Sequence, residues 1–158
     1  MPTHAQKQFM PYAPDQLFDL VADVGRYPEF LPWCVGARVR ERTETLLVAD
    51  LVIGFKVFRE RFTSHVTLER PNHIHVRYLE GPFRYLNNHW RFIPENDGTL
   101  VDFYVDFEFR SKILQAAIGL VFNEAVRLMV HAFERRARRI YGPTDSQPAG
   151  RPLPSPGG

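Results

Sequence analysis

One stretch of this sequence decides the fold: Val101-Asp102-Phe103-Tyr104-Val105-Asp106-Phe107-Glu108-Phe109. Its odd positions are all apolar, and its even positions are all acidic or polar. Successive side chains of a β-strand point to opposite faces of the sheet. The stretch therefore predicts a strand with one face in a core and the other face in water.

The same period of two runs through most of the chain before this stretch. Alternating apolar residues predict strands at 35–40, 47–55, 58–68, 74–78 and 86–92, and a short first strand at 7–12. Turn-forming residues separate several of them, at Arg70-Pro71-Asn72, Gly81-Pro82 and Asn96-Asp97-Gly98. Together these runs predict one curved antiparallel sheet of six to seven strands.

Helical periodicity flanks the strands on both sides. Apolar residues at 17, 20, 21 and 24 predict a helix that starts at Pro14, and Tyr27–Cys34 predicts a second short helix or tight turn. Ser111 is a suitable cap for one long helix that ends near Tyr141, before Gly142-Pro143. That helix would be roughly 45 Å long, so we expect it to lie across the whole sheet.

The order of elements predicts an α+β fold in which a curved sheet grips a long C-terminal helix, with two short helices after the first strand. A single helix rarely fills a strongly curved sheet, so we expect an apolar pocket between the two layers. Residues 1–142 form the predicted domain. Residues 143–158 are rich in Pro and Gly and lack aromatic residues, which predicts a disordered tail.

Composition narrows the class of protein. Lys and Arg number 20 against 18 Asp and Glu, and this near-neutral balance argues against a dedicated DNA-binding protein. The single cysteine, Cys34, excludes an intramolecular disulfide and a zinc site built on several cysteines, and we expect it to be a small buried residue. Residues 1–8 lack the apolar core of a signal peptide, and no apolar run has the length that a bilayer requires. We therefore expect a cytoplasmic protein.

Several longer motifs carry a family resemblance. They are Tyr27–Cys34, Phe55–Val66, Gly81–Leu86 with Trp90-Arg91-Phe92, Val105–Ser111 and Ala132–Ala137. With them the chain resembles the START-like, helix-grip (Bet v 1-like) domains of polyketide cyclase/dehydrase type over about residues 4–142. Within that group it looks like the coenzyme Q-binding proteins and the bacterial ribosome-association toxins.

The resemblance implies two functions, and the sequence leaves both open. The first is binding of ubiquinone or a similar polyprenyl lipid, as a ligand rather than a catalytic cofactor, by a chaperone or carrier that supports respiration. The second is binding to the large ribosomal subunit, which would block subunit joining. A third hypothesis is a cyclase-like or hydrolytic enzyme that uses the same pocket. The implied location is the cytoplasm, with peripheral contact to the inner membrane.

The candidate ligand-binding residues are the apolar and small polar side chains expected to face the pocket. They are Phe30, Leu31, Trp33, Phe55, Phe62, Ser64, Tyr78, Leu86, Asn88, Trp90, Phe103, Phe107, Leu114, Ala117, Ile118, Val121, Phe122 and Ala125. Ser64, Tyr78 and Asn88 are the candidate hydrogen-bond donors for a quinone carbonyl. The alternative is that the whole set forms an ordinary hydrophobic core.

The segment 113–122 is apolar nearly all round, which supports two interpretations. In the first, it forms a portal that touches the membrane, since a long polyprenyl tail must enter from a bilayer. In the second, the sheet and the short helices bury it. A basic cluster near the end of the long helix (Arg135, Arg136, Arg138 and Arg139) has two interpretations as well. In the first, the basic cluster contacts ribosomal RNA or anionic lipid. In the second, it is a solvated helix end whose charge complements the helix dipole.

Two further groups of residues are candidates for metal binding and for catalysis. His73 and His75 share a strand face and form half a metal site, but no nearby Cys or third His is evident, so we expect no metal. Glu60 is the candidate acid of an enzyme, because it shares a face with Phe62; alternatively, Arg59 or Arg61 holds it at the rim in a salt bridge. No Ser-His-Asp or glycine-rich phosphate motif accompanies it, so we expect no catalytic residues.

Overall fold

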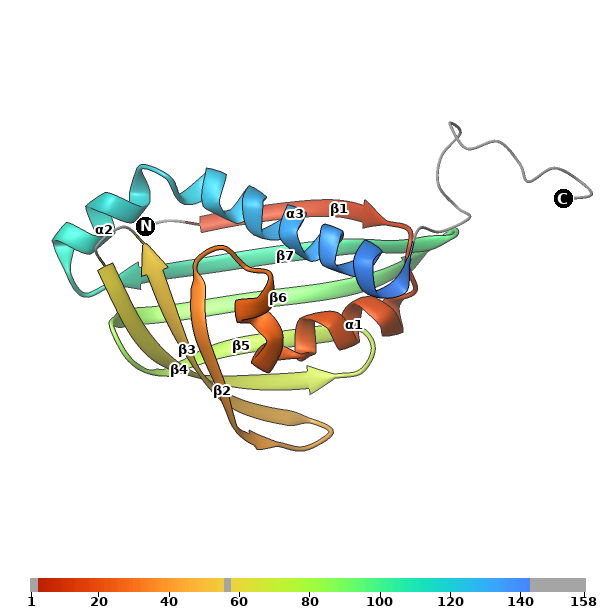
Figure 1. The fold of residues 1–158 in the computed structure, drawn as a ribbon, viewed down its shortest axis with the longest axis horizontal. Coiled ribbons are helices and arrows are strands. Elements are labelled where there is room, and N and C mark those ends of the chain that lie inside the picture. The colour runs from red at the N-terminus through yellow and green to blue at the C-terminus, as the bar shows by residue number, and fades with distance from the viewer. Residues whose placement is uncertain (1–2, 56–57, 143–158) are drawn as a thin grey trace, which may run out of the picture.

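The structure, a computed structural model, describes residues 3–55 and 58–142, without the side chains of Phe55 and Phe58. Its elements in chain order are β1 (Thr3–Met10), α1 (Pro14–Ala22), the 3-10 helix η1 (Val24–Glu29), β2 (Cys34–Arg42), β3 (Leu46–Phe55), β4 (Phe58–Glu69), β5 (His73–Glu80), β6 (Phe83–Glu95), β7 (Gly98–Phe109), α2 (Lys112–Gly119) and α3 (Phe122–Tyr141). The predicted α+β class with a curved antiparallel sheet and a C-terminal helix is confirmed (Figure 1). The predicted tail, 143–158, lies outside the described residues.

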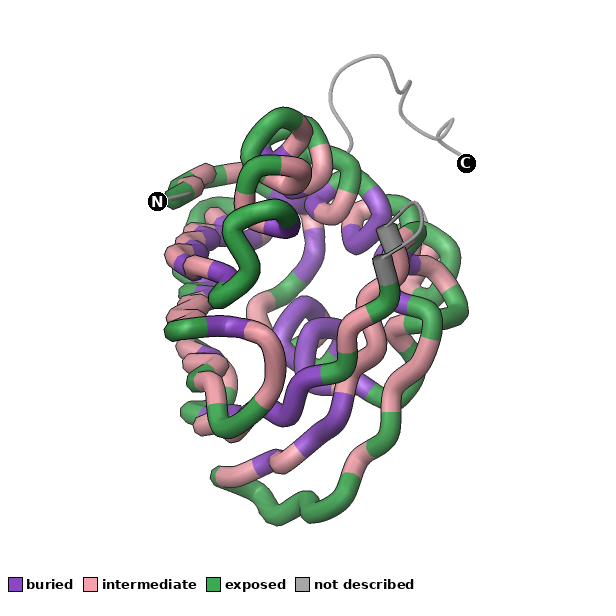
Figure 2. The backbone as a smooth tube through the Cα atoms, turned by 90° about the vertical axis from the view of Figure 1, so that its left-hand side faces the viewer, coloured by how far each residue is buried: buried purple, intermediate pink, exposed green. Residues whose placement is uncertain are grey.

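The sheet has seven strands in the order β1-β7-β6-β5-β4-β3-β2. Strand β7 alternates buried and partly exposed residues along almost its whole length, as the opening stretch predicted. Its inner face, which carries Phe103 and Phe107, is buried; its outer face, which carries Asp102 and Asp106, is in contact with solvent. The buried residues gather on the segments that surround the interior (Figure 2).

Strand β1 starts and ends earlier than the apolar pattern predicted. It covers Thr3–Met10 rather than 7–12, and it pairs with β7 along its full length. The polar residues before Lys7 form a strand because the free edge of β7 offers them backbone hydrogen bonds, which hydrophobic periodicity does not detect. The strand ends at Met10 because the amide of Tyr12 bonds back to the carbonyl of Met10 (2.8 Å), just past Pro11.

The predicted long helix is in fact two helices. Helices α2 and α3 meet at an angle of 66°, with the break at residues 120–121. Ser111 caps α2 as predicted, since its hydroxyl accepts the amide proton of Leu114 (3.1 Å). Gly119 weakens the helix before the break, and the turn lets the ring of Phe122 pack on Phe107, with centroids 5.0 Å apart.

The second short helix also differs from the prediction. It covers Val24–Glu29 instead of Tyr27–Cys34, and Cys34 already belongs to β2. The amides of Phe30 and Leu31 both bond to the carbonyl of Tyr27 (3.1 and 2.9 Å), which closes the helix. As a result η1 lies against β2 and the inner side of the sheet.

Helix α3 is the main cover of the inner face, and α1 packs beside it (Figure 1). The side chains of Val126, Val130, Phe133 and Ala137 are buried at helical spacing. The ring of Phe133 packs edge-on against Trp90 of β6, with centroids 5.1 Å apart. Each of the buried valine and phenylalanine side chains contributes about 1.5–3 kcal/mol by leaving water. These contacts fix α3 over one half of the sheet and leave space elsewhere.

Candidate ligand cavity

A cavity of about 510 Å³ lies between the inner face of the sheet and α3. Strands β3 to β7 form its floor, α3 forms its roof, and α1, η1 and the start of β2 close one side. Its lining is almost entirely aliphatic and aromatic. The predicted pocket is therefore present as a cavity. The apolar residues of the inner face enclose this space instead of filling it completely.

Most of the predicted ligand-binding residues line this cavity. They are Leu31, Trp33, Phe62, Ser64, Leu86, Asn88, Trp90, Phe103, Phe107, Ile118, Val121, Phe122 and Ala125. They come from five strands or loops and two helices that are distant in sequence. The alternation along each strand found the sheet residues because parity alone decides which face a side chain occupies.

Four predicted residues do not line the cavity. Phe30 packs outside it, against Phe133, with ring centroids 5.1 Å apart. Tyr78 accepts the amide proton of Phe83 on its hydroxyl (3.1 Å) and stacks edge-on with that ring, beyond the end of the cavity. Leu114 and Ala117 lie on α2, whose bend away from α3 removes them from the lining. The side chain of Phe55 lies outside the described residues.

Sequence reasoning missed part of the wall. The missed apolar lining residues are Val21, Val24, Tyr27, Leu51, Ile53, Val66, Ile74, Val76, Val105, Val126, Leu128, Met129 and Phe133. Those on strands lie on the same alternating face as the predicted residues of their strands, so the sequence pattern could have identified them. The members on α1 and η1 lacked such a signal, because their contact with the cavity depends on the path between β1 and β2.

The polar groups of the wall are few and mostly satisfied. The amide nitrogen of Asn88 donates to the carbonyl of Tyr104 (2.8 Å), and its oxygen accepts from the indole of Trp90 (3.1 Å). The Ser64 hydroxyl is also buried, on β4, with β5 between it and the strand of Asn88. The Tyr27 hydroxyl donates to the carbonyl of Val21, and burial raises its pKa, so it stays neutral. These three polar groups can orient a ligand but contribute no charge.

The titratable groups of the cavity do not form an acid-base pair. Burial raises the pKa of the Cys34 thiol, which keeps it protonated. Among the described lining residues, Glu124 is the one carboxylate; its side chain is exposed and forms an ion pair with Arg127. The candidate acid Glu60 does not line the cavity and borders a separate polar hollow. The predicted shared face of Glu60 and Phe62 is confirmed, since they lie opposite Ile53 and Leu51 of β3, which both line the cavity.

Large apolar side chains are exposed at the start of α2 and at its junction with α3. Leu120 is 87% exposed and Ile113 is 75% exposed, whereas Val121, next to Leu120, lines the cavity. The junction is thus a wall with apolar groups on both sides, which favours the portal interpretation over complete burial. Among the described residues no helix alone is long and apolar enough to span a membrane; α2 and α3 meet that test only as a bent pair.

A third histidine joins the predicted pair on the outer face, contrary to the sequence-based expectation. His89 of β6 lies directly opposite His75, and their rings stack with centroids 4.0 Å apart. Its Nδ1 lies 2.8 Å from Nε2 of His73, whose other nitrogen is bonded to Glu69 (2.8 Å). Within 3–55 and 58–142, no group of His, Cys, Asp and Glu side chains is arranged to hold a metal.

The basic cluster on α3 is divided. The guanidinium of Arg136 bonds to Glu29 of η1 (2.6 Å) and lies over the ring of Phe30 (4.9 Å), so it fastens α3 to η1. Arg135, Arg138 and Arg139 remain exposed to solvent. One of the four predicted contact residues is therefore structural, which leaves a weaker basic surface than the sequence suggested.

Comparison with known proteins identifies the family. Residues 10–134 match the family described as "Polyketide cyclase / dehydrase and lipid transport". The chain belongs to this family. It is 38% identical over 137 residues to "Ribosome association toxin RatA" of Rickettsia prowazekii, covering 84% of this chain and 94% of that protein.

A second relative carries a different name. "Coenzyme Q-binding protein COQ10 homolog B, mitochondrial" of Xenopus laevis is 33% identical over 144 residues, covering 88% of this chain and 59% of that protein. The solved structure of a "START superfamily protein" from Mycobacterium smegmatis superposes with a TM-score of 0.74 over 87% of this chain and 98% of that one, at 17% identity. This last likeness confirms the START-like fold.

Proposed function

We propose that the cavity binds a polyprenyl lipid, with ubiquinone as the specific candidate, and that the protein acts as its carrier or chaperone. The observation that carries the proposal is an apolar cavity of about 510 Å³ whose one carboxylate among the described lining residues, Glu124, is exposed and paired with Arg127. Small-molecule sites of roughly 300–1,000 Å³ with a few placed polar groups are typical of ligand-binding proteins. The family description and the name of the coenzyme Q-binding relative support the proposal.

The energetics suit a carrier. Each CH₂ group moved from water into the cavity contributes about 0.8 kcal/mol, so a prenyl chain does not escape readily into water. Transfer between a bilayer and the cavity exchanges one apolar environment for another, so it is nearly neutral in free energy. Reversible exchange with a membrane follows from these two facts.

The exposed apolar side chains at the start of α2 and at its junction with α3 supply the membrane contact in this proposal. Ile113 and Leu120 enter the interfacial layer of the bilayer, and the lipid tail passes beside Val121 into the cavity. The quinone ring meets the buried Ser64 hydroxyl and the Asn88 amide, which retains one N–H that is not used by Tyr104. A cytoplasmic protein that attaches peripherally to the inner membrane fits this mode of action.

The cavity supports binding rather than catalysis. A cyclase-like or hydrolytic enzyme requires an acid or base that touches its substrate. The described wall holds a neutral thiol and a neutral phenol, and the carboxylate of Glu124 lies at the exposed rim in an ion pair. We therefore propose no catalytic residue and no catalytic cofactor.

The test is lipid extraction and mass spectrometry of the purified protein. We expect wild-type protein to carry quinone, and Val121→Arg to lose it, because a charge would enter the apolar wall. The matched control is Ala116→Arg, which adds the same charge at an exposed position of α2. A folded wild-type protein without lipid, or equal lipid in Val121→Arg, would contradict the proposal.

A second candidate function is association with the large ribosomal subunit, which would block subunit joining. The name of the Rickettsia relative favours it, and so does a basic surface on the outer face of the sheet. Co-sedimentation with large subunits tests it directly. Because that surface and the cavity lie on opposite faces of the sheet, both functions fit one molecule.

A further inference from the structure

Arginine side chains gather on the outer face at the β2–β3–β4 end of the sheet. We call Arg38 and Arg40 of β2 and Arg59 and Arg61 of β4 the arginine cluster. Arg38 lies opposite Asp50 of β3, and three of the four arginines border a hollow of about 350 Å³ with Asp50. All four side chains are exposed.

The arginine cluster carries more charge than its acidic neighbours neutralise. Asp50 is 4% exposed; it accepts hydrogen bonds from the Thr63 hydroxyl (2.5 Å) and from Nε of Arg40 (2.9 Å). These bonds lower its pKa, so it is ionised and fully engaged. Glu60 also borders the hollow. Four guanidinium groups therefore gather around the buried carboxylate of Asp50, whereas Glu60, opposite Ile53, belongs to the other face of β4.

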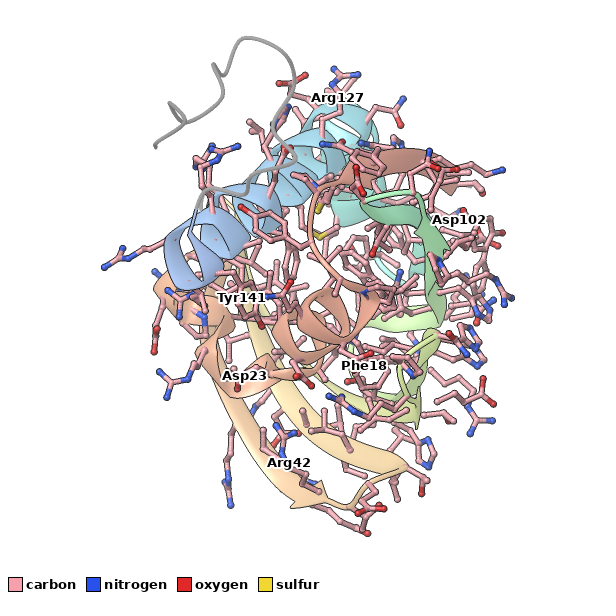
Figure 3. All side chains as sticks on the ribbon, turned by 90° about the vertical axis from the view of Figure 1, so that its right-hand side faces the viewer. Phe18, Asp23, Arg42, Asp102, Arg127 and Tyr141 are labelled. Atoms are coloured by element: carbon pink, nitrogen blue, oxygen red, sulfur yellow. The ribbon has the colours of Figure 1, made fainter. Side chains whose placement is uncertain are left out.

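Basic residues continue from the arginine cluster across the outer face. On β5, Arg77 lies opposite His65, and on β6, Arg91 lies opposite His73. The row is oblique, because Arg61, His65 and Glu69 mark successive levels four residues apart on β4, and it includes the carboxylate of Glu69, which bonds to His73. Across the strands, which are about 4.8 Å apart, this basic row spans roughly 19 Å from β2 to β6. It ends at β7, where the outward side chains of Asp102 and Asp106 are acidic; Asp102 lies on the side of the sheet away from α3 (Figure 3).

We propose that this basic row binds the phosphate backbone of RNA. Guanidinium groups bind phosphate through two parallel hydrogen bonds, and the cluster presents several of them side by side. A row of this width matches a chain of phosphates better than one free phosphate ion. The relative named as a ribosome association toxin favours RNA as the source of those phosphates.

The geometry separates this surface from the membrane contact. The exposed Ile113 and Leu120 belong to the helical layer, which covers the inner face of the sheet. Contact of that layer with a bilayer directs the arginine cluster away from the lipid. The inference is independent of lipid binding, and it gives the second candidate function a defined surface.

The test is a binding titration of the full chain with purified large-subunit ribosomal RNA at several salt concentrations. The double variant Arg38→Glu/Arg61→Glu should raise Kd at least tenfold and flatten the dependence of log K on log salt, because fewer counterions are released. Arg135→Glu/Arg139→Glu carries the same charge change on exposed residues of α3 and should leave Kd within about twofold. Equal weakening by both variants would overturn the inference, since it would show a net-charge effect.

Two further measurements complete the test. Arg38→Lys/Arg61→Lys keeps the charge but loses the paired hydrogen bonds, so its Kd should fall between wild type and the glutamate variant. The circular dichroism spectrum and the lipid content of the glutamate and lysine variants of the arginine cluster should match those of the wild type. Binding of duplex DNA or anionic vesicles as tight as that of RNA would overturn the choice of RNA. If the glutamate variant of the arginine cluster loses RNA binding but retains lipid, the RNA-binding surface is confirmed. If the wild-type protein binds RNA but carries no lipid, only the carrier function is contradicted.

Discussion

Val66 and Val76 pair across β4 and β5 inside the cavity, while their chain neighbours His65 and Arg77 pair on the outer face. The same strands therefore build an apolar container on one side and a charged surface on the other. No side chain contributes to both surfaces, because successive residues point in opposite directions. The lesson is that one period-two pattern specifies two chemistries that mutation can separate.

The most damaging change to the inner face should be Phe133→Ala. Phe133 is 2% exposed and packs edge-on against Trp90, Tyr27 and Phe30. Removing its ring should cost about 3–5 kcal/mol of unfolding free energy, measured by urea denaturation. Leu128→Ala, at a half-exposed position of the same helix, is the control and should cost far less. Similar losses in the two variants would mean that α3 is not fixed to the sheet through Phe133.

On the outer face, Asp50→Ala should have the next largest effect. It removes the charge-assisted bonds from Thr63 and Arg40, which we expect to cost about 2 kcal/mol. Lipid content should not change, and RNA affinity should rise because the arginine cluster loses its buried counter-charge. Lower lipid content in the folded variant would show that the two faces are coupled.

The histidine group should give the outer face a weak dependence on pH. Burial, with the neighbouring His75 and His73, lowers the pKa of His89 to about 4 from the usual 6.5. Between these values the unfolded chain binds more protons than the folded chain, so stability falls as pH drops from 6.5 to 4. We expect a loss of about 1 kcal/mol, because solvent screens a partly exposed imidazole.

The measurement is urea denaturation of wild type and His89→Asn at pH 7 and pH 4.5. The variant should lack this part of the pH dependence. Asp50 does not interfere, because its contribution is present above pH 3.8 and is lost only as pH falls through its lowered pKa. An identical pH profile for the two proteins would show that His89 titrates normally.

The smallest effect on stability should come from Leu120→Ser. Leu120 is 87% exposed, so the unfolding free energy should change by about 0.5 kcal/mol or less. Transfer of quinone to vesicles should nevertheless slow severalfold, because the junction of α2 and α3 loses an apolar anchor. Leu79→Ser, another exposed leucine on β5, is the control. Equal transfer rates for both variants would place the membrane contact elsewhere.

The sequence predicted what depends on local pattern. The alternation at 101–109 and its repeats gave the sheet, the inner face and most of the cavity wall. It could not locate the break at residues 120–121, because 113–122 is apolar nearly all round and helical periodicity alone does not show a bend. His89 and the arginine cluster were missed for another reason: pairing between strands decides which distant residues meet, and His73 and His89 lie 16 positions apart.

The edge strand β1 has a consequence for how the chain acquires its structure. The hydroxyl of Thr3 donates to Asp106 of β7 (3.1 Å), across 103 residues. Contacts this distant in sequence raise contact order and slow folding. During synthesis the first strand must wait, unpaired, until β7 has emerged, and α3 emerges later still. The container therefore closes only after α3 has emerged, which makes the nascent chain dependent on protection of its apolar strands until then.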